Sequence, residues 1–306
     1  MKEINEKRVV YLYEAVKMGT VRAAADKLNV APSAVSRQIS LLEEELACTL
    51  IERHRKGVTS TEAGDIVLRF YGESVASEET CISQLQLLRG LQRGHIKLAV
   101  GEGFIDDLMS GPLPEFNRLY PYLSLSINLA GSNEVIRLIE QDEVHMGLLF
   151  HPDNHPNIRS QVMSRQPICA IFSPQHPLAM QAAGALTLEE LADYPVALPE
   201  AHFGVRQLLA LAEFKERIRF KPILTTNSIS ALKHFARSNM GFTFLPRFAV
   251  AREIEDKQLI AIPVEQTILA GGEAHTITRL GRQLSGGPLH LLQHLMSWMK
   301  AFEENH

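Results

Sequence analysis

Residues 21–39 have the sequence VRAAADKLNVAPSAVSRQI, which predicts two short helices joined by a tight turn. Ala24 and Ala25 are small enough to let the second helix cross the first closely. Asn29 suits the turn because it tolerates left-handed backbone angles, and Pro32 suits a first helical turn because its missing N–H needs no partner there. The apolar contacts expected between the helices come from Leu28, Val30, Val35 and Ile39. This arrangement is typical of a helix-turn-helix, whose second helix enters the major groove of DNA, and an ordinary helical hairpin is the alternative.

The outward face of the second helix carries side chains that can hydrogen-bond base edges and phosphates. The DNA contacts predicted on this helix are Pro32, Ser33, Ser36, Arg37 and Gln38. A basic hairpin, or wing, is predicted next, with β-capable stretches at 49–51 and 58–59. Its cations would displace counterions from the DNA backbone. The predicted wing contacts are Arg53, Arg55 and Lys56. The acidic run at 43–45 would repel phosphate, so it must face away from DNA.

Bulk composition does not by itself indicate a nucleic-acid partner. The chain of 306 residues is 45% hydrophobic and 22% charged with a formal net charge of −4, and its length suggests two or three domains. Residues 1–60 carry 10 Lys and Arg against 8 Asp and Glu, so the argument for DNA rests on where the cations lie. No apolar stretch approaches the ~20 residues that span a membrane, and the start lacks an apolar signal core. We therefore expect a cytoplasmic protein with no membrane partner.

Other reactive side chains form no convincing catalytic or metal motif. The three cysteines are Cys48, Cys81 and Cys169. Their odd number and wide separation favour free thiols in a reducing compartment, with a redox role for Cys169 as the alternative. The pairs His151/His155 and His290/His294 lack a third ligand, and no GxSxG nucleophile elbow is present. We predict no catalytic residues, no metal and no cofactor.

A long helix is predicted from Thr61 to about Leu91. Its apolar stripe at near-helical spacing is Ile66, Val67, Phe70, Val75, Ile82, Leu85 and either Leu88 or Leu91. The helix is either a core helix or one that pairs with its copy in another chain. A polar, glycine-bearing hinge at 89–95 follows it.

Beyond this hinge, strands alternate with helices, a pattern that predicts right-handed βαβ units and parallel sheets. The predicted strands cover 96–100, 123–129, 144–150, 168–172, 196–198, 223–226, 241–246, 259–264 and 276–280. The predicted helices cover 112–120, 131–141, 188–191, 205–214, 228–239 and 288–303. Residues 271–275 are predicted as a loop. The turn at 101–103 does not continue as GxGxxG, so it does not indicate a dinucleotide site.

The first 64 residues resemble the N-terminal winged helix-turn-helix of LysR-type transcriptional regulators. The residues that carry the resemblance are Ala24, Ala25, Leu28, Val30, Ser36, Arg37, Gln38, Ile39, Leu42, Glu43, Leu46, Leu50, Glu52, Arg53, Thr61, Glu62, Ala63 and Gly64. Ala31 and Pro32 replace the usual Ser-Gln, which removes an N-cap worth about 1 kcal/mol and a Gln that often reads a base. Ala47 replaces the usual Gly and Ile51 the usual Phe, and neither change threatens the fold.

The rest of the chain is similar to the effector domain of the same family, which itself resembles periplasmic binding proteins. The order of elements and the segment 241–246 carry this looser resemblance, with departures at His145 and at 239–241. The fold it implies is α/β: an N-terminal winged helix-turn-helix and a long linker helix, then a two-lobed, periplasmic-binding-protein-like effector domain. The implied domains are 1–61, 62–91 and 95–306, with lobe I at 95–166 and 270–306 and lobe II at 167–269.

The resemblance also implies a function. The chain would be a sequence-specific DNA-binding transcriptional regulator, not an enzyme, with a small-molecule effector bound between its lobes. It would assemble as a homodimer or homotetramer through the linker helix, bind an interrupted palindrome in double-stranded DNA and contact RNA polymerase. The alternatives are a small-molecule binding protein with an incidental helical domain, and a redox- or metal-sensing regulator.

Four loops at the carboxyl ends of strands are the expected effector site, where helix N-termini offer free N–H groups. By resemblance, the effector contacts are Glu102, Gly103, Ser132, Asn133, His202, Phe203, Ser228 and Ile229. Ser132 and Ser228 are each expected to cap a helix and also meet the ligand, with capping alone as the alternative. Glu102 argues against a strongly anionic effector, or for one with an amine or hydroxyl, and Phe203 would stack on an apolar ligand.

Overall fold

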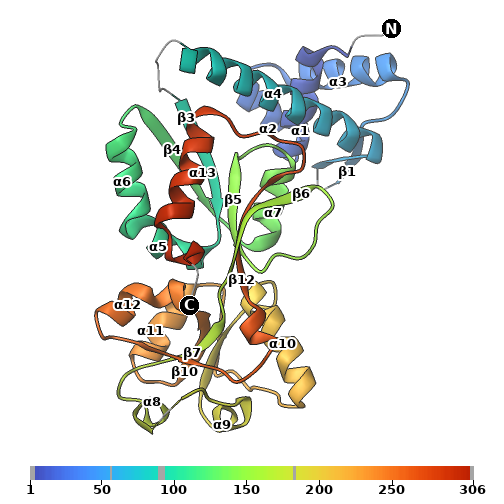
Figure 1. The fold of residues 1–306 in the computed structure, drawn as a ribbon. Coiled ribbons are helices and arrows are strands. Elements are labelled where there is room, and N and C mark those ends of the chain that lie inside the picture. Colours follow the sequence, from blue (N-terminus) through green and yellow to red (C-terminus); the bar gives the residue numbers. More distant parts are fainter. Residues whose placement is uncertain (1–3, 56, 89–93, 182–183, 304–306) are drawn as a thin grey trace. The chain divides into compact units, whose positions relative to one another are not determined.

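A computed structural model describes residues 4–55, 57–88, 94–181 and 184–303 (Figure 1). The chain divides into two compact units, Met1–Cys81 and Ile82–His306. Lys56 and residues 89–93, which include the predicted end of the long helix and most of the predicted hinge, lie outside the described residues. Within the described part of the chain, no helix combines the length and the apolar character that crossing a bilayer requires.

The first unit contains the predicted helix-turn-helix, which is confirmed. Its elements are α1 (Glu6–Lys17), α2 (Val21–Leu28), α3 (Pro32–Leu46), β1 (Ile51–His54), β2 (Gly57–Ser60) and α4 (Glu62–Leu88), which continues past the unit's end. Asn29 ends α2 in the left-handed conformation with φ 55°, and Pro32 is the first residue of α3. Both local predictions hold because each residue meets a backbone requirement that few others meet.

One core holds these helices and the wing together. Its fully buried side chains include Val9, Leu12, Ala24, Ala25, Val35, Ile39, Leu42 and Leu50. Strands β1 and β2 form an antiparallel hairpin in which Arg53 lies opposite Val58. The N–H of Val58 donates to Gly19 O at 2.7 Å, and a Cβ at Gly57 would lie only 2.1 Å from that same oxygen. The hairpin therefore needs a glycine at its second strand to sit against the α1–α2 turn.

The first wing strand begins two residues later than predicted. The prediction placed it at 49–51, whereas β1 runs from Ile51 to His54. The reason lies in α3, where Glu43 Oε1 accepts the N–H groups of Leu50 at 2.8 Å and Ile51 at 3.4 Å. The Glu43 carboxylate thus binds the backbone just before the wing, and the pairing of β1 with β2 begins only at Ile51.

Helix α4 begins where it was predicted to begin, and it has one buried face and one exposed face. Thr61 Oγ1 accepts the N–H of Gly64 at 3.0 Å, which caps the helix. Val67 is buried in the core of the first unit, whereas Ile66 is 62% exposed. The other exposed apolar side chains of the predicted stripe are Phe70, Ile82 and Leu85. One part of the stripe thus lies in the core, and these four exposed side chains are left largely uncovered by the residues that the structure describes.

The second unit consists of two lobes, each built on a five-stranded sheet with the strand orders β4-β3-β5-β12-β6 and β11-β7-β10-β8-β9. Lobe I contains β3 (Gly94–Val100), η1 (Glu102–Phe104), α5 (Ile105–Ser110), α6 (Pro112–Leu119), β4 (Leu123–Leu129), α7 (Ser132–Glu140), β5 (Met146–Phe150) and β6 (Ile158–Arg165), and later β12 (Glu273–Arg279), α13 (Gly286–Trp298) and η4 (Lys300–Phe302). Lobe II contains β7 (Ile168–Phe172), α8 (Pro177–Gln181), α9 (Leu188–Ala192), β8 (Val196–Pro199), α10 (Gly204–Glu216), β9 (Leu224–Thr226), α11 (Ile229–Arg237), β10 (Phe242–Pro246), η2 (Arg247–Val250), α12 (Ala251–Glu255), β11 (Ile260–Pro263) and η3 (Leu269–Gly271). Most predicted elements are present within a few residues of their predicted ends.

The prediction of parallel sheets is only partly right, because both sheets are mixed. Strand β3 is parallel to β4 and β5, but β12 runs antiparallel to β5 and β6. In lobe II, β7 runs antiparallel to β10 and β11. The antiparallel partners β6, β7, β11 and β12 adjoin the two passages between the lobes, where no crossover helix constrains strand direction.

Two passages of the chain join the lobes, and they are hydrogen-bonded to each other. Figure 1 shows the β6–β7 connection and the approach to β12 running between the lobes. Gln166 N donates to Gly272 O at 2.7 Å, which ties one passage to the other. The buried Gln166 side chain donates to Ala301 O at 3.0 Å, which ties both to the last described turn. The lobes therefore share a double-stranded hinge.

Candidate functional site

The outward face of α3 is set by the residues that the helix buries. Val35 and Ile39 are buried, while Pro32, Ser33 and Arg37 are exposed. Ser36 and Gln38 are half-buried on the flanks of this face. Exposed Ser40 follows Ser33 by seven residues and was not among the predicted contacts. Ser33, Arg37 and Ser40 follow the i, i+4, i+7 spacing of one helix face. This spacing in the sequence could have identified Ser40 as a further candidate contact.

Two of the three acidic residues at 43–45 have structural partners, whereas Glu44 is exposed. Glu43 accepts the backbone N–H groups that lead into β1, and Glu45 pairs with Arg8 of α1 at 2.8 Å. Arg53 and Arg55 are exposed on the wing. The third predicted wing cation, Lys56, lies outside the described residues. Helix face and wing together make a surface suited to base edges and phosphates.

The lobes of the second unit enclose a cavity with about 490 Å³ of empty space, part of it open to solvent. Five predicted effector contacts line it: Glu102, Gly103, Ser132, Phe203 and Ile229. Most of the remaining lining is apolar and includes Phe104, Leu149, Phe150, Val205, Leu245 and Phe248.

The other three predicted contacts lie beside the cavity. His202 packs its ring on Phe203 with centroids 4.6 Å apart, and its Nδ1 is 3.5 Å from Glu200 Oε2. Asn133 is exposed on the first turn of α7. Ser228 is half-buried and hydrogen-bonded to Glu102, which does line the cavity. All four predicted loops thus contribute residues to the cavity lining, and five of the eight predicted contacts are among them.

Only one of the two predicted serine caps exists. Ser228 Oγ accepts the N–H of Ala231 at 3.3 Å and so caps α11. The prediction that Ser132 caps α7 is wrong, because the N-cap is Gly131 and it provides no side-chain hydrogen bond. Gly131 has the extended backbone of a cap, whereas Ser132 is already the first helical residue, a position from which its oxygen cannot act as the cap.

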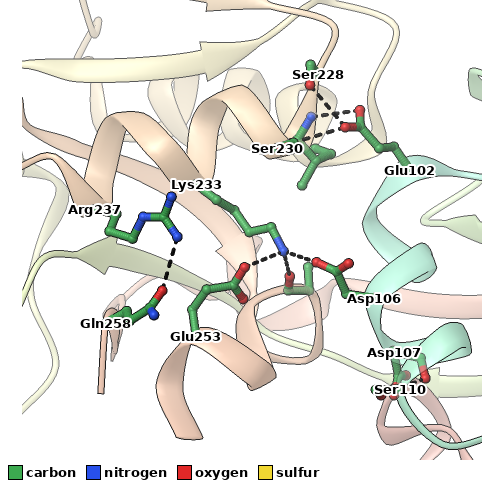
Figure 2. A network of polar contacts seen from close by, with 12 residues as sticks. Glu102, Asp106, Asp107, Ser110, Ser228, Ser230, Lys233, Arg237, Glu253 and Gln258 are labelled. Carbon is green, nitrogen blue, oxygen red and sulfur yellow. Dashed lines mark hydrogen bonds and ion pairs between the residues drawn. The ribbon is translucent and has the colours of Figure 1, made fainter. Parts of the chain in front are cut away.

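Glu102 of lobe I binds the start of α11 in lobe II (Figure 2). Its Oε2 accepts the N–H of Ile229 at 2.7 Å. Its Oε1 accepts the N–H of Ser230 at 3.1 Å and the hydroxyl of Ser228 at 3.0 Å. Ser230 was not predicted as a site residue. A carboxylate is thus already bound where α11 presents its free N–H groups and its positive dipole end.

One helical turn further along both elements, a second contact joins the lobes. Lys233 of α11 forms an ion pair with Asp106 of α5. The same ammonium group donates to Ala249 O at 3.0 Å and lies 2.8 Å from Glu253 Oε1. Figure 2 shows Lys233 between the two carboxylates, with Glu102 nearby at the start of the helix. Sequence patterns gave no indication of this pair, since its partners lie far apart in the chain.

Three of the four histidines in the pairs His151/His155 and His290/His294 contact other groups of the protein. His294 Nε2 lies 2.8 Å from Pro112 O, and its ring stacks on Trp298. His290 stacks on Tyr120, with centroids 5.3 Å apart. His155 Nδ1 lies 3.5 Å from Glu140 Oε1. Over the ranges that the structure describes, no three His, Cys, Asp or Glu side chains gather to hold a metal ion.

The thiol chemistry of Cys169 gives a direct test of the redox alternative. Burial raises the pKa of Cys169 to about 11, so roughly one thousandth of it is thiolate near pH 8. We expect a thiol reagent to label exposed Cys81 rapidly and buried Cys169 only near pH 11 or after unfolding. Mass spectrometry of the labelled chain, with Cys81→Ser and Cys169→Ser assigning the signals, measures this. Rapid labelling of native Cys169 at neutral pH would favour a redox role.

Comparison with known proteins gives the class. Residues 7–65 match the model described as bacterial regulatory helix-turn-helix protein, lysR family, and residues 89–300 match the LysR substrate binding domain. The RuBisCO operon transcriptional regulator of Allochromatium vinosum is 27% identical over 267 residues, which cover 84% of this chain and 85% of that protein. The chain belongs to the LysR family of transcriptional regulators, with a helix-turn-helix and an effector-binding domain.

Solved structures show the same fold. ArgP from Mycobacterium tuberculosis matches 99% of this chain and 100% of its own with a TM-score of 0.72 at 17% identity. Full-length CbnR, a structure determined in complex with its target DNA, matches 96% of this chain and 99% of its own with a TM-score of 0.58 at 17% identity. At such identities the likeness concerns the fold alone.

Proposed function

We propose that this regulator reads an interrupted palindrome in double-stranded DNA. The observation that carries the proposal is the face of α3, where exposed Ser33 and Arg37 lie opposite buried Val35 and Ile39. Base contacts would come from that face, with Ser40 added to the predicted set, and backbone contacts from the wing cations. The solved CbnR complex with target DNA supports DNA as the partner of this fold.

The assembly we propose is a homodimer or homotetramer. The uncovered apolar side chains of α4, such as Ile66 and Phe70, support pairing with a second copy. A two-fold axis would present two recognition helices to two half-sites, so each helix adds binding energy.

The proposed domains are 1–61 for DNA binding, 62–91 for dimerisation and 95–306 for the effector. The proposed setting is the cytoplasm, where RNA polymerase is a further partner, and we propose no enzymatic activity.

The effector we propose is a small molecule bound between the lobes. The match to a substrate binding domain and the cavity between two lobes on a double-stranded hinge support it. Gly103, Ser132, Phe203 and Ile229 would contact the ligand directly. Closing or opening the hinge would then shift the population of states in which the DNA-binding units match their half-sites.

Selection of DNA fragments by the purified full-length protein tests the proposal. Sheared genomic DNA from the source organism would be incubated with protein at moderate salt, and bound fragments would be sequenced. We expect an enriched motif with two-fold symmetry and a spacer. Protein with Arg37→Ala is the matched control, and enrichment that is identical for both would contradict reading by α3. The selection would be repeated with added cell metabolites as a source of effector. The proposed function would be contradicted if neither selection enriched a specific sequence.

A further inference from the structure

The contact between Glu102 and α11 is one of several contacts between the two lobes, which also pack Phe104 of lobe I against Phe248 of lobe II. Three donors, the N–H groups of Ile229 and Ser230 and the hydroxyl of Ser228, converge on the one carboxylate. The first N–H groups of a helix have no partner within the helix. Those of Ile229 and Ser230 therefore need an acceptor outside the helix, and Glu102 provides it in this structure. Hydrogen bonds to an ionised carboxylate are stronger than neutral ones, and the helix dipole adds to them.

A second pair reinforces the first with matching geometry. Glu102 and Asp106 are four residues apart, and so are Ile229 and Lys233. Two successive turns of lobe I thus engage two successive turns of α11 (Figure 2). The Lys233 side chain is 10% exposed and the Asp106 side chain 46%, so the pair lies at the edge of the contact between the lobes. Two-point contact fixes the lobes in rotation as well as in distance.

The charge of the cavity follows from the same residue. Among the described residues that line it, only Glu102 and Ser132 have polar side chains, and none is a lysine or arginine. An anionic ligand would meet the negative charge of Glu102 in a largely apolar space and would find the N–H groups of α11 already bonded. Both the repulsion and the lost hydration of the anion would oppose its entry.

We propose that Glu102 is an internal carboxylate ligand that latches the lobes together and excludes anionic effectors from the cavity. The latch stands on the contacts alone, and its consequence for the effector rests on the proposed function. Effectors that fit this chain are neutral or cationic small molecules, because these do not compete with the Glu102 carboxylate for the N–H groups of α11. Glu102 is then the residue that determines effector charge.

Hydrogen exchange of the full-length protein tests the latch at two amides. Mass spectrometry with single-residue fragmentation would follow Ile229 and Ser230, with Ala231, bonded within its own lobe, as the internal reference. We expect Glu102→Ala to speed exchange of both amides at least about tenfold, since each loses a bond to a charged group. Glu115→Gln is the matched control, because it neutralises a lobe I carboxylate whose partner, Arg118, is in the same helix. Unchanged exchange in Glu102→Ala would overturn the proposal.

Chemical rescue by acetate tests the exclusion of anions. Acetate supplies a free carboxylate, so it should restore protection of Ile229 and Ser230 in Glu102→Ala and leave the wild type unchanged. Acetamide, which is neutral and of similar size, is the control ligand. The proposal would be overturned if acetate slowed exchange of the Ile229 and Ser230 amides equally in the wild type and in the variant. It would also be overturned if acetate slowed exchange in neither protein. Because this assay contains no DNA, its failure is distinguishable from a failure of the DNA selection.

Discussion

Replacing Arg37 with alanine should lower the affinity for the selected site by about 1–3 kcal/mol for each recognition helix, the value of a bidentate contact to a base. A dimer carries two such helices, so the total loss should approach twice that figure. The physical reason is that Arg37 is exposed on the side of α3 opposite buried Val35 and Ile39. Titrations of labelled DNA at one fixed salt concentration, with the selected site and a scrambled site, measure the change.

Comparison with two other substitutions separates base reading from general attraction. Arg118→Ala removes the same charge from the effector-binding domain and should leave both affinities unchanged. Arg55→Ala on the wing should weaken binding to both DNAs and reduce the salt slope by about one, because a phosphate contact does not depend on sequence. A loss in Arg37→Ala that is equal for the selected and scrambled sites would show that Arg37 contacts the backbone instead.

Substituting Asp142 by asparagine should destabilise lobe I by about 3–5 kcal/mol, since it removes the charge of a buried carboxylate that pairs with Arg279 and Arg282. The Asp142 carboxylate is 2% exposed and accepts from Arg279 Nε at 2.5 Å and from Arg282 at 2.7 Å. Asparagine is the sharper substitution, because Asp142 has φ 52° and asparagine tolerates that conformation. The change therefore tests the charge and not the backbone.

Fluorescence of Trp298 during urea unfolding measures this loss. It is the one tryptophan of the chain and lies on α13 of lobe I, so its signal reports on that lobe. Glu134→Gln is the control, because Glu134 is half-exposed and pairs with Arg137 on the surface, where such pairs contribute about 0–1 kcal/mol. Similar midpoints for Asp142→Asn and the control would mean that water reaches the two arginines once Asp142 is neutral.

Local chemistry explains which features the sequence predicted well. Asn29 and Pro32 mark the helix-turn-helix because each satisfies a backbone requirement within a few residues of chain. Thr187 opens α9 with a complete capping box, and Ser228 caps α11, for the same reason. Where a signal is local and its alternatives are few, one sequence is enough to place an element.

Features that depend on distant partners were missed or misplaced. Strand β6 was not predicted, because its exposed positions carry a mixed polar sequence and its pairing partner, β12, lies more than a hundred residues further on. The segment Glu273–His275, predicted as a loop, begins β12 for the same reason. The contacts of Glu102 with Ser228, Ile229 and Ser230 span more than a hundred residues and leave no periodic trace.

The paired passages between the lobes make lobe II an insertion whose two ends meet. Gln166 and Gly272 lie on either side of it and are hydrogen-bonded to each other. A segment whose ends are adjacent can be exchanged without stretching the host, as in domain insertion and circular permutation. Lobe II is therefore a segment that can be exchanged as a unit. A chimera joined at these two residues would carry a relative's lobe II on this chain's lobe I. Its lobe II would have to accept Glu102, because that side chain contacts lobe II directly.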